Sequence, residues 1–258
     1  MCRHEAAEAL GALGDWESLG LLKEFRDDTQ EVEVVRETCD IAVERIEWEY
    51  SCQSKAEHIL NRFFFLKSIP SLAIGSSSFW NSDFTSIDPA PPLAQTAQPP
   101  SIPDLQGKLL DTRLPLFDRY RAMFALRDLS SPPNLPRAVP AVEALASGFS
   151  DRSALFRHEI AFVFGQLSHP ASIPSLIGIL SKKTEESMVR HEAAEALGSL
   201  GDEEGVEDVL KSFLDDPEQV VRESVIVALD MAEFEKNGEM EYAVLPGGQG
   251  FSPLTKIK

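Results

Sequence analysis

Apolar residues recur every three or four positions through most of the chain, which is the spacing of one buried face of an α-helix. Around residues 189–200, at about 100° per residue, Ala193, Ala196, Leu197 and Leu200 fall within roughly 80° of Val189. No stretch alternates apolar and polar residues for the length of a β-strand. The pattern therefore predicts an all-α protein.

Two further helices show the same apolar stripe, which we expect to pack in the core. One stripe consists of Ile160, Val163, Phe164 and Leu167, and the other of Ala6, Ala9, Leu10 and Leu13. The second belongs to a duplicated segment, because residues 4–11 and 191–198 both read HEAAEALG. The similarity extends downstream at an offset of about 187 residues, so 1–47 and 188–235 are two copies of one structure.

A finer period runs through the second copy. Equivalent positions at 119, 157, 190 and 222 are separated by 38, 33 and 32 residues, and short Pro- and Gly-containing breaks divide the helices. This period is typical of helical hairpins of the HEAT type, which stack into a solenoid. We expect two HEAT-like repeats at 1–50, a linker at 51–103, four repeats at 104–235 and a flexible tail at 236–258.

The expected linker contains an apolar run at 56–81 and a proline-rich stretch at 89–103. Arg62, Lys67 and Pro70 interrupt the apolar run, so it does not fit a membrane span. Two interpretations stay open for it: an extra docking helix, or a translated intron or unrelated insertion. The proline-rich stretch is typical of an extended linker.

The tripeptide Arg-His-Glu occurs at 3–5, 157–159 and 190–192. His191 falls at roughly 200° from Val189, opposite the apolar stripe, and His4 and His158 are placed alike on their helices. The recurrence fits either metal ligands or a solvated face inherited with the repeat. The aligned repeats at Arg121 and Arg222 lack the histidine, so its retention in three repeats favours metal ligands.

Imidazole and carboxylate groups without a thiolate suit iron, manganese or zinc. Equivalent positions on adjacent repeats lie on the order of 10 Å apart, so His158 and His191 can meet at one ion. Glu192 would complete a set of two histidines and one carboxylate, which leaves coordination positions open for oxygen. Glu159 would be a ligand or a base, and Glu195, one turn after His191, would orient that histidine or face solvent.

The charge balance bears on the partner. Lys and Arg number 24 against 42 for Asp and Glu, which gives a formal net charge of −18. Such a surface repels phosphate backbones and favours a basic protein partner over nucleic acid. The three cysteines show no CxxC spacing, which argues against a disulfide framework, and no signal-peptide pattern opens the sequence.

Several strings taken together resemble the deoxyhypusine hydroxylase family. They are VRHEAAEALG at 189–198, FRHE at 156–159, SIDPAPPL at 86–93, LPLFDRYRAMFALR at 114–127 and VVRESVIVALDM at 220–231. The resemblance covers 1–50 and about 83–245, which is most of the chain.

The resemblance implies a HEAT-like monooxygenase with two irons between two halves of four repeats, in the cytoplasm and the nucleus and without a membrane anchor. Such an enzyme uses dioxygen to hydroxylate the deoxyhypusine side chain of a translation initiation factor, which gives hypusine. The metal ligands that it implies are His4, Glu5, His158, Glu159, His191 and Glu192, and Glu159 is also its catalytic candidate.

The family has four His-Glu pairs, and the sequence contains three of them. The fourth is expected about 33 residues before His4, ahead of Met1, so we interpret the sequence as an N-terminally truncated copy. We expect it to bind one or two irons and to show little or no hydroxylase activity as it stands. The alternatives are a non-catalytic HEAT-repeat scaffold that binds proteins and a bilin-lyase-like repeat protein.

Overall fold

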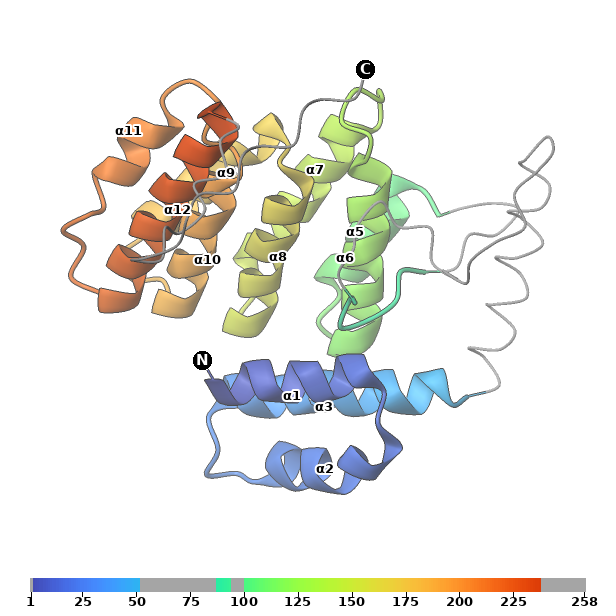
Figure 1. Cartoon of the computed structure of the whole chain (residues 1–258). Coiled ribbons are helices and arrows are strands. Elements are labelled where there is room, and N and C mark those ends of the chain that lie inside the picture. The colour runs from blue at the N-terminus through green and yellow to red at the C-terminus, as the bar shows by residue number, and fades with distance from the viewer. Residues whose placement is uncertain (1, 52–86, 94–99, 238–258) are drawn as a thin grey trace, which may run out of the picture.

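The computed structural model describes residues 2–51, 87–93 and 100–237, and every regular element among them is helical. The prediction of an all-α solenoid is confirmed (Figure 1). Within these ranges no helix is both long and apolar enough to cross a bilayer. The apolar run at 56–81 and the tail beyond 237 lie outside the described residues.

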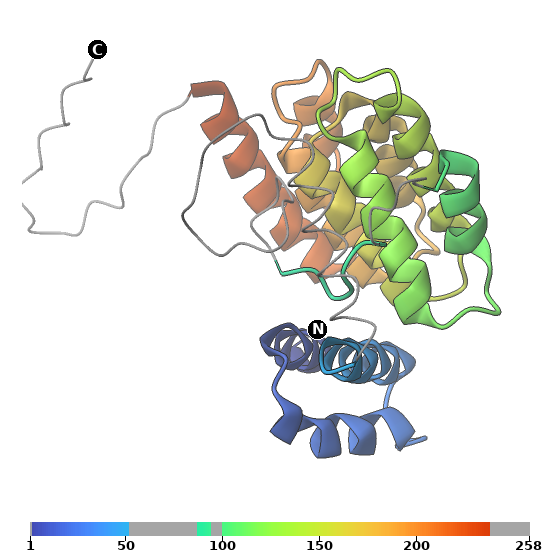
Figure 2. The same ribbon diagram turned by 90° about the vertical axis from the view of Figure 1, so that its right-hand side faces the viewer.

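The second half of the molecule, residues 100–237, is a stack of helical hairpins. Its helices are α5 (Ile102–Leu110), α6 (Leu116–Ser130), α7 (Ala138–Ala146), α8 (Ala154–Leu167), α9 (Ile173–Ser181), α10 (Ser187–Gly198), α11 (Val206–Lys211) and α12 (Gln219–Asn237). Short 3₁₀ turns, η2 (Ser147–Ser150) and η3 (Pro170–Ser172), lie in two of the connections. In sequence, α6, α8, α10 and α12 each pack on the next and form one layer, with α7, α9 and α11 behind it (Figures 1 and 2).

The first half, residues 2–51, consists of α1 (Cys2–Leu13), the 3₁₀ turn η1 (Trp16–Ser18), α2 (Leu19–Asp27) and α3 (Glu33–Glu49). Both α1 and α2 pack against α3, and α3 in turn contacts α6 and α8. Figure 1 shows α1 and α3 lying across the ends of the vertical α6 and α8. The first turns of α8 and α10 therefore face α1.

Local signals set the helix ends around this junction. Ser153 caps α8 by accepting a hydrogen bond from the Phe156 amide, and Ser168 ends the same helix in the left-handed conformation at φ 43°. Gly205 precedes α11 at φ 83°, a conformation that is costly for residues with a side chain. Ser153 and Ser168 thus set the two ends of α8, the helix that carries His158 and Glu159.

Each half has its own hydrophobic core. The first-half core is formed by α1, α2 and α3 around Ile46 and Leu22, and a larger core runs from α5 to α12. Ile41 and Trp48 of α3 belong to the second core, and the Trp48 ring lies 6.5 Å from that of Phe117. The two halves are thus held together by apolar contacts from α3.

Two of the three predicted core stripes are correct and the third is wrong. The stripes on α8 and α10 are buried or half-buried, whereas Ala6, Ala9 and Leu13 on α1 are exposed. The side of α1 that is buried carries Ala7 and Gly11, which face α3. In the second half α8 covers the equivalent stripe of α10, but no described helix lies on that side of α1.

The division into six repeats stays a prediction. The region 1–50 contains one hairpin, α1 with α2, followed by the single long helix α3. The region 104–235 contains three hairpins, α6–α7, α8–α9 and α10–α11, flanked by α5 and α12.

Candidate metal centre

The three motif histidines meet at the junction of the two halves. His4 is near the start of α1, and His158 and His191 are each the fifth residue of α8 and α10. The His158 ring centroid lies 5.5 Å from that of His4 and 5.5 Å from that of His191. All three side chains are buried.

Two adjacent repeats contribute a set of three potential metal ligands. One ligand atom from each of His158, His191 and Glu192 lies within 4.8 Å of the others. The Nε2 atom of His158 is 3.3 Å from Oε2 of Glu192. This is the set of two imidazoles and one carboxylate that the repeat spacing predicted.

Several buried polar atoms of the site lack a hydrogen-bond partner. They are both ring nitrogens of His4, both of His158, Nε2 of His191 and Oε1 of Glu159. An unpaired buried polar group costs roughly 1–3 kcal/mol, and such groups are uncommon in native proteins unless an ion or a water satisfies them. The residues present therefore fit a metal ion bound by nitrogen and oxygen.

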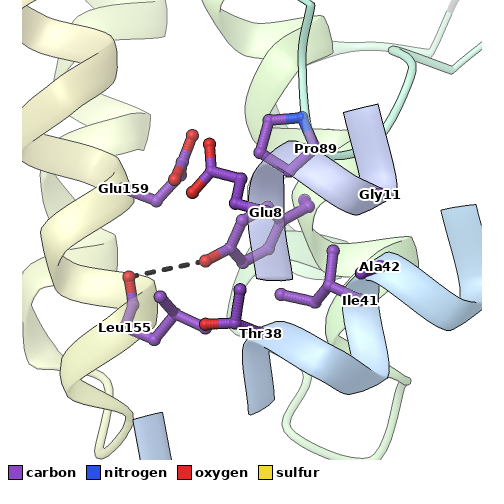
Figure 3. Close-up of a pocket in the computed structure, with 9 residues that line it drawn as sticks. Glu8, Gly11, Thr38, Ile41, Ala42, Pro89, Leu155 and Glu159 are labelled. Carbon is purple, nitrogen blue, oxygen red and sulfur yellow. Dashed lines mark hydrogen bonds between the residues drawn. The ribbon is translucent and has the colours of Figure 1, made fainter. Parts of the chain in front are cut away.

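The remaining predicted ligands differ in exposure. The Glu5 side chain is 58% exposed, and its Oε1 lies 3.3 Å from Nε2 of His4. Glu159 is buried and lies outside the three-ligand set of the second half. Its carboxyl group is turned toward Glu8 of α1 (Figure 3).

A small cavity lies where the two halves and the 87–93 segment meet. Its lining residues are Glu8, Gly11, Thr38, Ile41 and Ala42 from the first half, Pro89, and Tyr120, Leu155 and Glu159 from the second half (Figure 3). The Tyr120 hydroxyl donates a hydrogen bond of 3.4 Å to the carbonyl of Leu155. Glu8 was not among the predicted site residues, although its position in HEAAEALG matches that of Glu195.

Burial and neighbouring charges shift the protonation of the site. Burial, followed by the charge of Glu8, raises the pKa of Glu159 well above its usual range. Burial and Glu5 likewise raise the pKa of Glu8. Burial, with His158 next, lowers the pKa of His4 to about 4. At His158 burial acts in the same direction, but the carboxylates of Glu192, Glu8 and Glu5 together outweigh it and raise the pKa. His4 is thus neutral near pH 7, the form in which imidazole binds metals.

The contact expected of Glu195 is present. Its Oε1 atom lies 3.3 Å from Nδ1 of His191, and the Ser224 hydroxyl donates a 2.8 Å hydrogen bond to the same oxygen. The hydrogen bond with His191 lowers the pKa of Glu195. Ser224 comes from α12 and was not predicted, because its proximity depends on how α12 packs against α10.

The arginines of the two motifs in the second half have a structural role that the sequence analysis missed. Arg190 makes two hydrogen bonds to Asp216, of 3.0 and 2.5 Å, and Arg157 pairs with Glu185. Both acidic residues precede the next helix of the layer. An acidic residue before each following helix was the available sequence signal. These pairs fix the ends of α8 and α10 from which the histidines project.

The fourth histidine within the described ranges plays a different part. His169 is buried at the start of η3, where its Nδ1 atom accepts a hydrogen bond of 3.1 Å from the Ala171 amide. This agrees with its interpretation as a residue of a repeat connection. His58 lies outside the described residues.

Comparisons with known proteins give a consistent result. A model described as HEAT repeats matches residues 140–230. The deoxyhypusine hydroxylase of Phaeosphaeria nodorum is 68% identical over 252 residues, which is 98% of this chain and 70% of that protein. The deoxyhypusine hydroxylase of Aspergillus clavatus is also 68% identical, over 95% of this chain and 68% of its own length.

A solved structure supports the same assignment. Human deoxyhypusine hydroxylase in complex with glycerol matches with a TM-score of 0.68 and 44% identity, over 89% of this chain and 67% of the human one. Identity at this level over nearly the whole chain shows common descent. The chain therefore belongs to the deoxyhypusine hydroxylase family.

Proposed function

We propose that the histidine–glutamate cluster between the halves holds iron and that the enzyme uses dioxygen to hydroxylate the deoxyhypusine side chain of a translation initiation factor, forming hypusine. One observation carries the proposal: three buried histidines meet with five ring nitrogens that make no hydrogen bond, next to the carboxylates of Glu192 and Glu159. Family membership supplies the hydroxylase activity, and the site supplies the residues for it.

The donor set divides between the halves. His158, His191 and Glu192 would hold one iron, and His4 and Glu5 would contribute to a second. Bound iron would supply the activation of dioxygen, which no protein side chain provides.

The cavity residues would handle the substrate. Glu159 and Glu8 face one another at its wall, and Glu159 is the residue to which we assign the catalytic role (Figure 3). A cationic amine brought close to this carboxylate would favour the ionised form of Glu159 and be held by it. Tyr120, Leu155 and Pro89 form an apolar surround that limits the access of water.

The charge of the whole chain suits this substrate. A net charge of −18 attracts a basic protein segment and speeds its encounter with the site. We place the enzyme in the cytoplasm and the nucleus, where it would encounter a translation initiation factor.

Metal content and turnover should be measured on the same preparation. Purified chain loaded with ferrous iron under anaerobic conditions should hold one or two irons, and a variant with His158→Ala and His191→Ala should hold markedly less. Hypusine formation on a deoxyhypusine-bearing substrate then tests the reaction. The sequence-based expectation of little turnover by the 258-residue chain stays a prediction.

The scaffold alternative gives a different result in the same assay. A protein-binding solenoid without a metal centre would retain no iron above the level of the double variant. The bilin-lyase-like alternative is not favoured by the relatives named above, which are deoxyhypusine hydroxylases.

A further inference from the structure

We infer that Glu195, held by Ser224, is a positioning residue that fixes the tautomer and the ring orientation of His191. In this arrangement the Nδ1–H group of His191 donates to Glu195, and Nε2 is left free to bind a metal. The inference rests on the proposed metal-binding function for its consequence, but its structural content can be measured without metal.

The contacts of the imidazole separate its two nitrogens. Nδ1 of His191 lies 3.3 Å from Glu195 Oε1 and 3.4 Å from Ser224 Oγ, whereas Nε2 is buried without a partner. An ionised carboxylate can only accept a hydrogen bond, so the proton belongs on Nδ1. Nε2 then presents its lone pair to the cluster with His158 and Glu192.

Ser224 restricts Glu195 from the opposite side. Its hydroxyl donates a hydrogen bond of 2.8 Å to the same Oε1 atom that faces His191. Ser224 is buried on α12, whereas the Glu195 side chain is 40% exposed. The hydrogen bond from a buried group therefore holds a carboxylate that would otherwise be free to turn into solvent.

The first half provides an internal comparison in which this arrangement is missing. The residues matching His191, Glu195 and Ser224 are His4, Glu8 and Thr38. The Thr38 hydroxyl donates to the carbonyl of its own helix at Val34, at 2.7 Å, and Glu8 is turned toward Glu159. Both nitrogens of His4 lack a hydrogen-bond partner.

A histidine that is held in the binding tautomer loses less freedom when it coordinates a metal. Removing an outer-shell partner of this kind typically weakens metal affinity by about 10–100-fold. We therefore expect the metal position served by His191 to be filled at a lower metal concentration than the one served by His4.

The direct test is the tautomer of His191 in the metal-free chain. Long-range ¹H–¹⁵N spectra at mildly alkaline pH, assigned with His191→Gln, should show the proton on Nδ1. Glu195→Ala should shift the population toward the Nε2–H form, while Glu195→Gln, which keeps an acceptor oxygen, should preserve it. An Nε2–H tautomer in the unmodified chain would overturn the inference whether or not the protein binds metal.

Cobalt(II) titration, followed by its visible absorption, measures the consequence. Glu195→Ala should weaken binding at the tighter position by about 10–100-fold, and Ser224→Ala by a smaller factor in the same direction. The control is Glu223→Ala, which changes an exposed residue next to Ser224 on α12. This variant should bind cobalt with the affinity of the unmodified chain. Unchanged affinity in Glu195→Ala would contradict the positioning role. A chain that binds no cobalt at all would instead contradict the proposed function.

Discussion

Helices α1 and α10 contain the same eight residues, HEAAEALG. Each packs against the second α-helix after it, α1 against α3 and α10 against α12. A Cβ atom on Gly11 would lie 2.8 Å from Cβ of Ala42 in α3, and one on Gly198 would lie 2.8 Å from Cα of Ala228 in α12. Each glycine thus permits the same close approach of two backbones. The shared sequence reproduces the helix pair, including this close approach.

The surroundings of the two helices differ. Arg190 is 2% exposed and paired with Asp216, whereas the Arg3 side chain is 63% exposed. Leu200 is 1% exposed and Leu13 is 75% exposed. The comparison teaches that the motif determines the helix and its donors, while the neighbouring elements decide how much each residue contributes to stability and how each histidine is held.

The motif arginines Arg190 and Arg3 should show the largest difference in their contribution to the free energy of unfolding. Arg190→Ala leaves Asp216 charged and buried without its partner, so we expect a loss of about 3–5 kcal/mol in the free energy of unfolding. Arg3→Ala removes an ion pair with Glu31 in which the arginine is 63% exposed. The Glu31 side chain is only 5% exposed but keeps the Val32 amide as a donor, so we expect a smaller loss, of about 1 kcal/mol. Denaturant unfolding of both variants measures the difference, and equal losses would contradict the comparison.

The leucines that follow the two octapeptides, Leu200 and Leu13, should show the second-largest difference in stability. Leu200→Ala removes a side chain from the core of the second half and should cost about 3 kcal/mol. Leu13→Ala changes an exposed position and should stay within about 0.5 kcal/mol. The same denaturant assay applies, and a cost of several kcal/mol at Leu13 would show that its side chain is covered in solution.

This pair of leucines also shows what the sequence could predict. Periodicity places Leu13 and Leu200 on equivalent stripes, and the identical octapeptides give no reason to separate them. Burial depends on which helix lies alongside, and α8 covers α10 whereas no described helix covers the same side of α1. Helix existence, repeat type and the sharing of a site by His158 and His191 were predictable, because they follow from local spacing.

The hydrophobic periodicity could not predict contacts between helices of different repeats. Glu8 faces Glu159, and Ser224 reaches Glu195, because of how helices from different repeats meet. The three-ligand set was predicted because it needs only two adjacent repeats. The approach of His4 to His158 needs the docking of one half on the other.

The last effect is the loss of folding stability at acid pH that the lowered pKa of His4 predicts. Its folded pKa of about 4 lies below the ordinary value near 6.5, so the unfolded chain binds this proton more tightly. The contribution of the neutral histidine is therefore complete above pH 6.5 and is lost as the pH falls toward 4, by at most about 3 kcal/mol.

Unfolding of the metal-free chain at a series of pH values measures this effect. His4→Gln removes the titrating group, so its stability should fall less over the same interval. Parallel curves for the two proteins would show that His4 does not titrate with a lowered pKa.

Metal binding by histidine variants tests the central claim most directly. Iron or cobalt bound per chain should drop strongly in His158→Ala and in His191→Ala, because each removes a nitrogen from the three-ligand set. His169→Asn is the matched control, since asparagine can keep the cap on the Ala171 amide and the residue lies outside the cluster. The account predicts normal metal content for His169→Asn and loss in the other two variants. Equal metal content in all three would contradict it.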